Sequence, residues 1–125
     1  MSRRVPIVAM TVTLVTLAAA AFAQDLVQQG IKVYADRKCS VCHSIAGKGN
    51  TKGPLDEVGS KLTADEMRAW MVTPKEMTVK TKSERKPAML AYPDLSKPDL
   101  EALVAYMVSL KKAPDAAAGS STAAK

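Results

Sequence analysis

The sequence predicts an all-α fold of about three main helices joined by long loops. No stretch of the 125 residues alternates apolar and polar side chains with the period of two that is typical of a half-buried strand. Apolar residues recur instead at intervals of three and four, most clearly over residues 100–110. Prolines and capping residues divide the chain into separate helical segments.

Residues 1–23 are predicted to be a cleaved secretory signal peptide. Two arginines precede an apolar run, and a small-x-small pattern predicts cleavage near Ala23/Gln24. Cleavage there would deliver a periplasmic or otherwise exported protein, whereas a retained segment would approach the length of a membrane anchor. About 102 residues would remain, with 16 basic and 12 acidic side chains. That length is enough for one small domain, at 24–112.

The first mature helix is expected to begin near Asp25, an acceptable N-cap, and to run to Lys38. Gly30 lies in its middle, where glycine costs about 1 kcal/mol relative to alanine. The usual compensation is the close approach of another helix. Glycine, asparagine and proline then predict a loop over residues 44–60.

Thr63 and Glu66 form a capping box that opens a second helix, which Pro74 is expected to end. Residues 75–88 are polar and basic, and we expect them to form an extended surface loop. Ser96 caps the third helix, which carries the apolar stripe described above.

The end of the chain, 113–125, is rich in alanine and serine and is predicted to be a disordered tail.

The motif Cys39-Ser40-Val41-Cys42-His43 carries the chemistry. These are the only two cysteines and the only histidine of the chain. The spacing is typical of c-type haem attachment, in which two thiols bond the porphyrin and the adjacent imidazole binds its iron. A thioredoxin-like redox pair would need a βαβ pattern, and a zinc site would need about four ligands. The motif therefore favours haem over either alternative.

The sixth position of the iron decides the function, and methionine, lysine or no ligand could fill it. Methionine opposite histidine suits electron transfer, whereas an open position suits small-ligand chemistry. Met67, Met71 and Met107 lie on predicted helix faces and are more typical of core. Met77 and Met89 lie in predicted loops, and Met89 is better placed because it belongs to an apolar segment between two prolines.

The chain resembles the class I c-type cytochromes, the small monohaem cytochrome c family, over residues 25–112. The resemblance rests on the haem motif, on Gly53-Pro54, and on 89–96 leading into 99–106. It implies a cytochrome c-like fold wrapped around one covalently bound haem. It also implies that the first helix crosses the last at Gly30.

The resemblance further implies the ligands of the site. Cys39 and Cys42 would bond haem c covalently, and His43 and Met89 would be the proximal and distal ligands of the iron. Met77 stays the alternative distal ligand, because leucine follows Met89 where many members of the family have proline.

Two further residues are expected around the haem. The carbonyl of Pro54 would accept the Nδ1 proton of His43 and fix its ring. The indole of Trp70 would reach a haem propionate, with a purely structural role in the core as the alternative.

The expected function is that of an exported one-electron carrier rather than an enzyme, because no catalytic constellation is present. Redox proteins with acidic docking surfaces are the expected partners, and nucleic acid is not. The basic residues that would attract such partners are Lys75, Lys80, Lys82, Arg85 and Lys86. Alternatives are an electron-relay subunit of an oxidase or dehydrogenase complex, and a haem sensor or enzyme with an open or labile sixth position. Membrane contact is expected only if the signal segment is retained.

Overall fold

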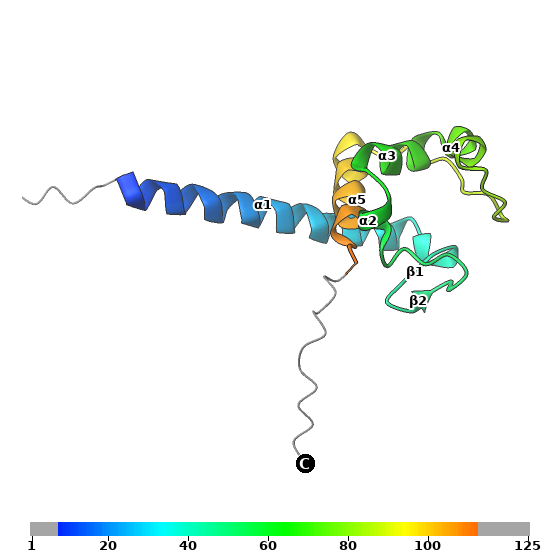
Figure 1. The fold of residues 1–125 in the computed structure, drawn as a ribbon, viewed down its shortest axis with the longest axis horizontal. Helices are drawn as coiled ribbons and strands as arrows, with labels where there is room; N and C mark the ends of the chain where they lie inside the picture. Colours follow the sequence, from blue (N-terminus) through cyan, green and yellow to red (C-terminus); the bar gives the residue numbers. More distant parts are fainter. Residues whose placement is uncertain (1–7, 113–125) are drawn as a thin grey trace, which may run out of the picture.

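The computed structural model describes residues 8–112, with side chains from residue 19 onward, and its fold is all-α as predicted (Figure 1). Residues 1–7 of the predicted signal peptide and the predicted tail 113–125 lie outside the described residues. The elements in chain order are α1 (Val8–Asp36), the 3-10 turn η1 (Cys39–Val41), β1 (Ser44–Ile45), β2 (Lys48–Gly49), α2 (Val58–Lys61), α3 (Ala64–Val72), α4 (Pro74–Thr81) and α5 (Lys97–Ser109).

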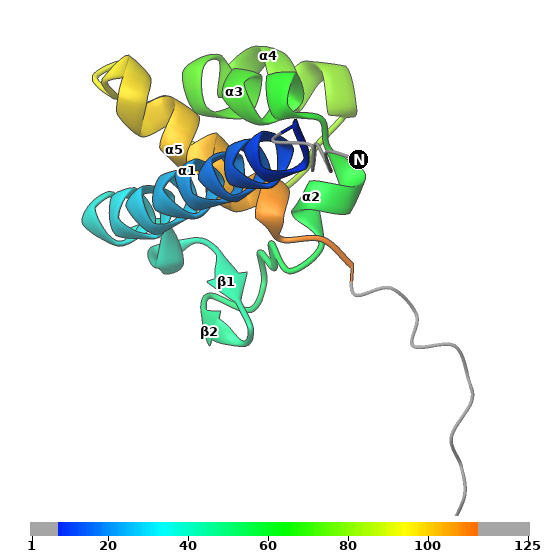
Figure 2. The ribbon, with the colours of Figure 1, turned by 90° about the vertical axis from the view of Figure 1, so that its left-hand side faces the viewer.

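The crossing of α1 and α5 is the main helix contact, and it passes through Gly30 as expected (Figures 1 and 2). A Cβ at Gly30 would lie 2.6 Å from Cβ of Tyr106 and 2.8 Å from the carbonyl carbon of Ala102. Beside it, the rings of Tyr34 and Tyr106 meet edge to face, with centroids 5.9 Å apart. Only glycine allows the two backbones this approach.

In the uncleaved chain one continuous helix runs from Val8 through Asp25 to Asp36, so Asp25 is an interior residue. Alanines before Asp25 are strong helix formers and continue the helix across the predicted cleavage site. The N-cap predicted at Asp25 concerns the mature chain and stays a prediction. The first half of α1 projects away from the other helices (Figure 1), and Phe22 is 71% exposed. Among the described residues, no helix has both the length and the hydropathy that crossing a bilayer requires. Cleavage of a signal peptide stays a prediction.

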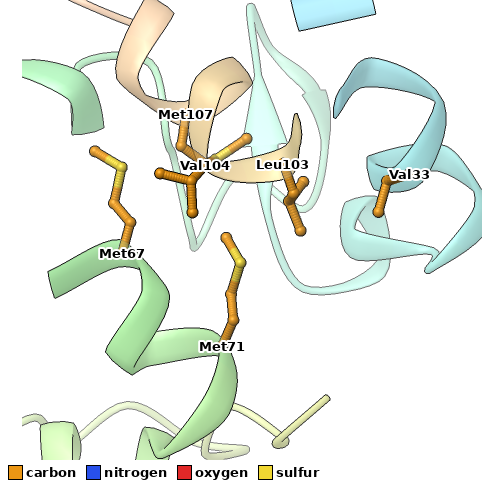
Figure 3. Packing of buried hydrophobic residues seen from close by; sticks show 6 residues of the cluster. All are labelled: Val33, Met67, Met71, Leu103, Val104 and Met107. Atoms are coloured by element: carbon orange, nitrogen blue, oxygen red, sulfur yellow. The ribbon is translucent and has the colours of Figure 1, made fainter. Parts of the chain in front are cut away.

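The core lies between α3 and α5, with one contribution from α1 (Figure 3). The capping box predicted for α3 is present: the Glu66 amide donates to Thr63 Oγ1 at 3.2 Å, and the Thr63 amide donates to the Glu66 carboxylate at 2.9 Å. Arg68 then joins α3 to α5 through two hydrogen bonds to Glu101, at 2.8 and 2.6 Å. The buried cluster consists of Val33, Met67, Met71, Leu103, Val104 and Met107.

The extended loop predicted for residues 75–88 is wrong in its first half, where the structure has α4. Pro74 ends α3 but also occupies the first turn of α4, a position that proline favours. The hydroxyl of Thr78 donates to the Pro74 carbonyl at 2.8 Å, and that of Thr81 donates to the Met77 carbonyl at 2.8 Å. Met77 is consequently a buried helix residue, 5% exposed.

The predicted loop over 44–60 is also partly ordered. It contains the antiparallel hairpin of β1 and β2 and the single turn of α2. Ala46 and Gly47 at the hairpin tip both have positive φ, of 50° and 73°. Such a pair is typical of the tight turn that fits the twist of a hairpin.

Candidate functional site

A cavity of about 410 Å³ lies between the helical core and the Cys39–His43 segment, with chiefly apolar walls. It brings together most of the predicted site residues. Those that line it are Cys39, His43, Pro54, Trp70 and Met89. Cys42 is exposed and lies outside the lining. This volume is in the range of pockets that hold organic ligands and cofactors.

The cysteine motif forms a tight turn immediately after α1. Lys38 has a φ of 53°, which reverses the chain, and η1 begins at the next residue. The carbonyl of Cys39 accepts hydrogen bonds from the amides of Cys42 and His43, at 3.1 and 2.9 Å. Both cysteines are free thiols, and burial raises the pKa of Cys39. The turn therefore presents two thiols and one imidazole within a single short segment.

The imidazole of His43 is oriented by the loop beneath it. Its Nδ1 lies 3.1 Å from the carbonyl oxygen of Gly53, and Tyr34 donates its hydroxyl to the His43 carbonyl at 3.4 Å. Burial lowers the pKa of His43, and the Gly53 hydrogen bond opposes that shift only in part. With Nδ1 donating to a carbonyl, the neutral ring keeps a lone pair on Nε2, which is the arrangement of a metal ligand.

The predicted partner of His43 was the carbonyl of Pro54, and in the structure it is that of Gly53. The reason is the pairing of this loop with Ser44. Gly53 accepts from the Ser44 amide at 3.1 Å, and the Leu55 amide donates to the Ser44 carbonyl at 2.9 Å. Because successive residues of an extended segment face opposite sides, the carbonyl of Pro54 points away from Ser44 and His43. Pro54 itself still lines the cavity.

The loop that carries Met89 is attached to the helices on its C-terminal side. The Tyr92 amide donates to the carbonyl of Met71 in α3 at 2.8 Å, and Asp94 pairs at 2.5 Å with Arg37, the residue that follows α1. Met89 is half-buried and lines the cavity, whereas its neighbour Leu90 is 73% exposed.

Four methionines line the cavity, and Met77 is not among them. Met77 is buried in α4, so the structure does not bring the alternative distal ligand to the site. Met67, Met71 and Met107 reach the cavity from helix faces and belong to the buried core, as the sequence predicted. Met89 is the one that a loop supplies.

The five basic residues of the predicted docking loop are divided by the structure. The four lysines are exposed on α4 and the loop after it, at positions 75, 80, 82 and 86. Arg85 is exposed as well, but it also lines the cavity and donates through Nη2 to the carbonyl of Cys42. Nothing in the sequence distinguished Arg85 from the lysines around it. The role of Gly53 as the partner of His43 is likewise not predicted from the sequence.

The residues of the cavity, together with Cys42 outside its lining, fit a c-type haem. Thiols at positions 39 and 42 stand at the correct spacing, the imidazole has a free Nε2, and a thioether and apolar side chains complete the walls. Within residues 8–112, no three of the histidine, cysteine, aspartate and glutamate side chains gather as a metal site would need. The zinc alternative therefore gains no support from this part of the chain.

Comparison with known proteins agrees with this geometry. Residues 27–111 match the family model described as "Cytochrome c". Over 97 residues the chain is 31% identical to "Cytochrome c oxidase subunit 2" of Alkalihalophilus pseudofirmus, an alignment that covers 70% of this chain and 27% of that protein. The chain thus spans about a quarter of the length of this relative. No solved structure matches.

Proposed function

We propose, from the membership of this chain in the cytochrome c family, that it is an exported one-electron carrier with a single covalently bound haem c. The family match itself indicates haem-based electron transfer. When bound, the haem iron supplies one-electron chemistry by alternating between its ferric and ferrous states. Cys39 and Cys42 would hold the porphyrin through thioether bonds. His43 would bind the iron through Nε2, and Met89 would bind it from the opposite side.

The observation that carries this proposal is the hydrogen bond between His43 Nδ1 and the Gly53 carbonyl, inside a cavity that Met89 also lines. A fixed imidazole and a thioether give the same ligand set to both oxidation states, so little reorganisation accompanies each transfer. Apolar walls keep water from the ligands, which favours electron transfer over small-ligand chemistry. Trp70, half-buried in the lining, would direct its indole N–H toward a propionate.

Mass spectrometry of the mature exported protein tests the cofactor, with the mass of one haem added to the polypeptide as the expected result. A bare polypeptide would refute the proposal. The N-terminus of the same sample tests export, because cleavage near Ala23/Gln24 is expected.

Met89→Ala tests the distal ligand, with Met77→Ala as the matched control. We expect M89A to lose the absorption band of methionine bound to ferric haem. We expect its reduction potential to fall by about 100 mV or more, since axial ligands move haem potentials over about 0.8 V. M77A removes a buried methionine outside the cavity, so it should lower stability and leave the spectrum unchanged. A wild-type spectrum and potential for M89A would show that another group binds the iron.

Transient docking is the expected way in which this carrier meets its redox partners. The exposed lysines at positions 75, 80, 82 and 86 provide a positive surface that would attract an acidic partner. Electron-transfer rates that fall as salt rises would support this role, and rates that are independent of salt would contradict it.

A relay within a larger complex is the second candidate, favoured by the likeness to an oxidase subunit. Recovery of a free monomer from the exported fraction would support the mobile carrier. Stable co-purification with oxidase or dehydrogenase subunits would support the relay.

A further inference from the structure

Arg85 behaves differently from every lysine near it in sequence. Its guanidinium lies against the α-carbon of Gly53, where any added Cβ would collide with it. Its Nη2 donates to the carbonyl of Cys42, and its side chain lines the cavity. The next residue, Lys86, is exposed as Arg85 is, but it does not line the cavity.

Both residues that Arg85 contacts are neighbours of His43. Cys42 directly precedes His43, and Gly53 accepts the hydrogen bond of the His43 ring at 3.1 Å. Arg85 precedes Met89 by four residues. Tyr92, whose amide is bonded to α3, follows Met89, so the two contacts lie on opposite sides of Met89 in sequence. One side chain thus connects the haem-attachment segment with the loop that carries the distal methionine.

The charge of Arg85 acts on the same site. A guanidinium carries a fixed positive charge. The contacts of Arg85 with the Cys42 carbonyl and with Gly53 hold this charge beside the residue that precedes His43 and the residue that is hydrogen-bonded to its ring. The charge should therefore disfavour the extra positive charge of a ferric iron bound to His43 relative to the ferrous one.

We propose that Arg85 is a positioning residue that fastens the Met89 loop to the haem-attachment segment and, through its fixed charge, raises the reduction potential of the iron. The inference rests on the proposed function, because it requires a haem held by His43 and Met89. The step concerned is the gain of one electron by ferric iron to give ferrous iron, with the electron supplied by the redox partner. Arg85 changes its equilibrium and is neither oxidised nor reduced.

The test compares Arg85→Gln, Arg85→Lys and Lys86→Gln in the haem-loaded protein. R85Q and K86Q each remove one positive charge from adjacent positions, but only R85Q removes it from the cavity. We expect R85Q to reduce the equilibrium constant for reduction about threefold, which at 59 mV per tenfold change for one electron is about 28 mV. K86Q should change it by less than half as much. R85K keeps the charge and should restore most of the potential.

The positioning role has a separate measurement, the temperature at which the band of methionine-ligated ferric haem is lost. R85Q and R85K should both lose this band at lower temperature than wild type, because one ammonium cannot reproduce the contacts of the planar guanidinium. K86Q should match wild type. Equal shifts of potential in R85Q and K86Q, or an unchanged loss temperature in R85K, would overturn the proposal. If R85Q fails to fold, the temperature at which R85K loses the band still tests the positioning role.

The wild-type protein separates this test from that of the proposed function. A wild type without bound haem, or without a reversible one-electron transition, refutes the proposed function. A wild type that has both, with R85Q indistinguishable from K86Q, refutes the role of Arg85 alone.

Discussion

Replacing Gly30 with alanine should open the crossing of α1 and α5 and lower the free energy of unfolding by about 2 kcal/mol. The new Cβ would stand 2.6 Å from Cβ of Tyr106 and against the backbone of Ala102, so no rotation of a flexible side chain can make room for it. Overpacking costs about 1–3 kcal/mol, and we take about 3 kcal/mol here because the clash includes backbone atoms. Alanine regains about 1 kcal/mol through its higher helix propensity, which leaves a net loss of about 2 kcal/mol.

Urea unfolding of the haem-loaded protein measures this loss. With a slope of about 1–2 kcal/mol per molar for a domain of this size, the midpoint should fall by about 1–2 M. Gln28→Ala is the control, because Gln28 is exposed on the same helix and its replacement changes propensity without adding a contact. If G30A unfolds at the same urea concentration as wild type, the inference that the two helices are too close for a side chain at position 30 is wrong.

Two further substitutions test local features of the fold. Thr63→Ala removes the side chain that caps α3 and should lower the free energy of unfolding by about 1 kcal/mol, which lowers the melting temperature by about 4–8 °C. Thr51→Ala, at an exposed position, is the control. Equal melting temperatures for the two variants would contradict the capping role. Arg37→Gln tests the ion pair that attaches the Met89 loop to the turn after α1. The hydrogen bond from Arg37 holds the pKa of Asp94 below its ordinary value of 3.8. The pair therefore stabilises the fold fully above that pH, and its contribution is lost as pH falls through the lowered pKa. Wild type and R37Q should differ in urea midpoint at pH 7 and converge in acid, and a gap that does not depend on pH would refute the assignment.

Local chemistry made the helix boundaries predictable where a cap is present. Thr63 and Ser96 each accept the amide hydrogen bond that their position in the sequence predicts, because a cap depends only on residues three apart. Pro74 shows the limit of the same reasoning. A proline that ends one helix can also begin the next, and the sequence was interpreted for the first role only.

The site was predictable to the extent that its chemistry is contained in residue types. Cysteine, histidine and methionine are recognisable from the sequence as haem ligands. Of the five predicted residues that line the cavity, four have a side-chain group that could bind or contact a haem: Cys39, His43, Trp70 and Met89. The partner of His43 depends instead on which carbonyl faces it, and the pairing of Gly53 and Leu55 with Ser44 decides that. The contact of Arg85 with the Cys42 carbonyl likewise depends on how the fold brings together two segments that are 43 residues apart in sequence.

The crossing at Gly30 also bears on the order of events when the chain is made. The first of its two helices leaves the ribosome early and the second, α5, comes almost last, so the crossing cannot close until nearly the whole domain has been synthesised. Closing this segment costs conformational entropy, by an amount that grows slowly with the number of residues between its ends. Until the crossing closes, the cavity beside Cys39 lacks the part of its wall that α5 supplies, because Leu103 and Met107 line it.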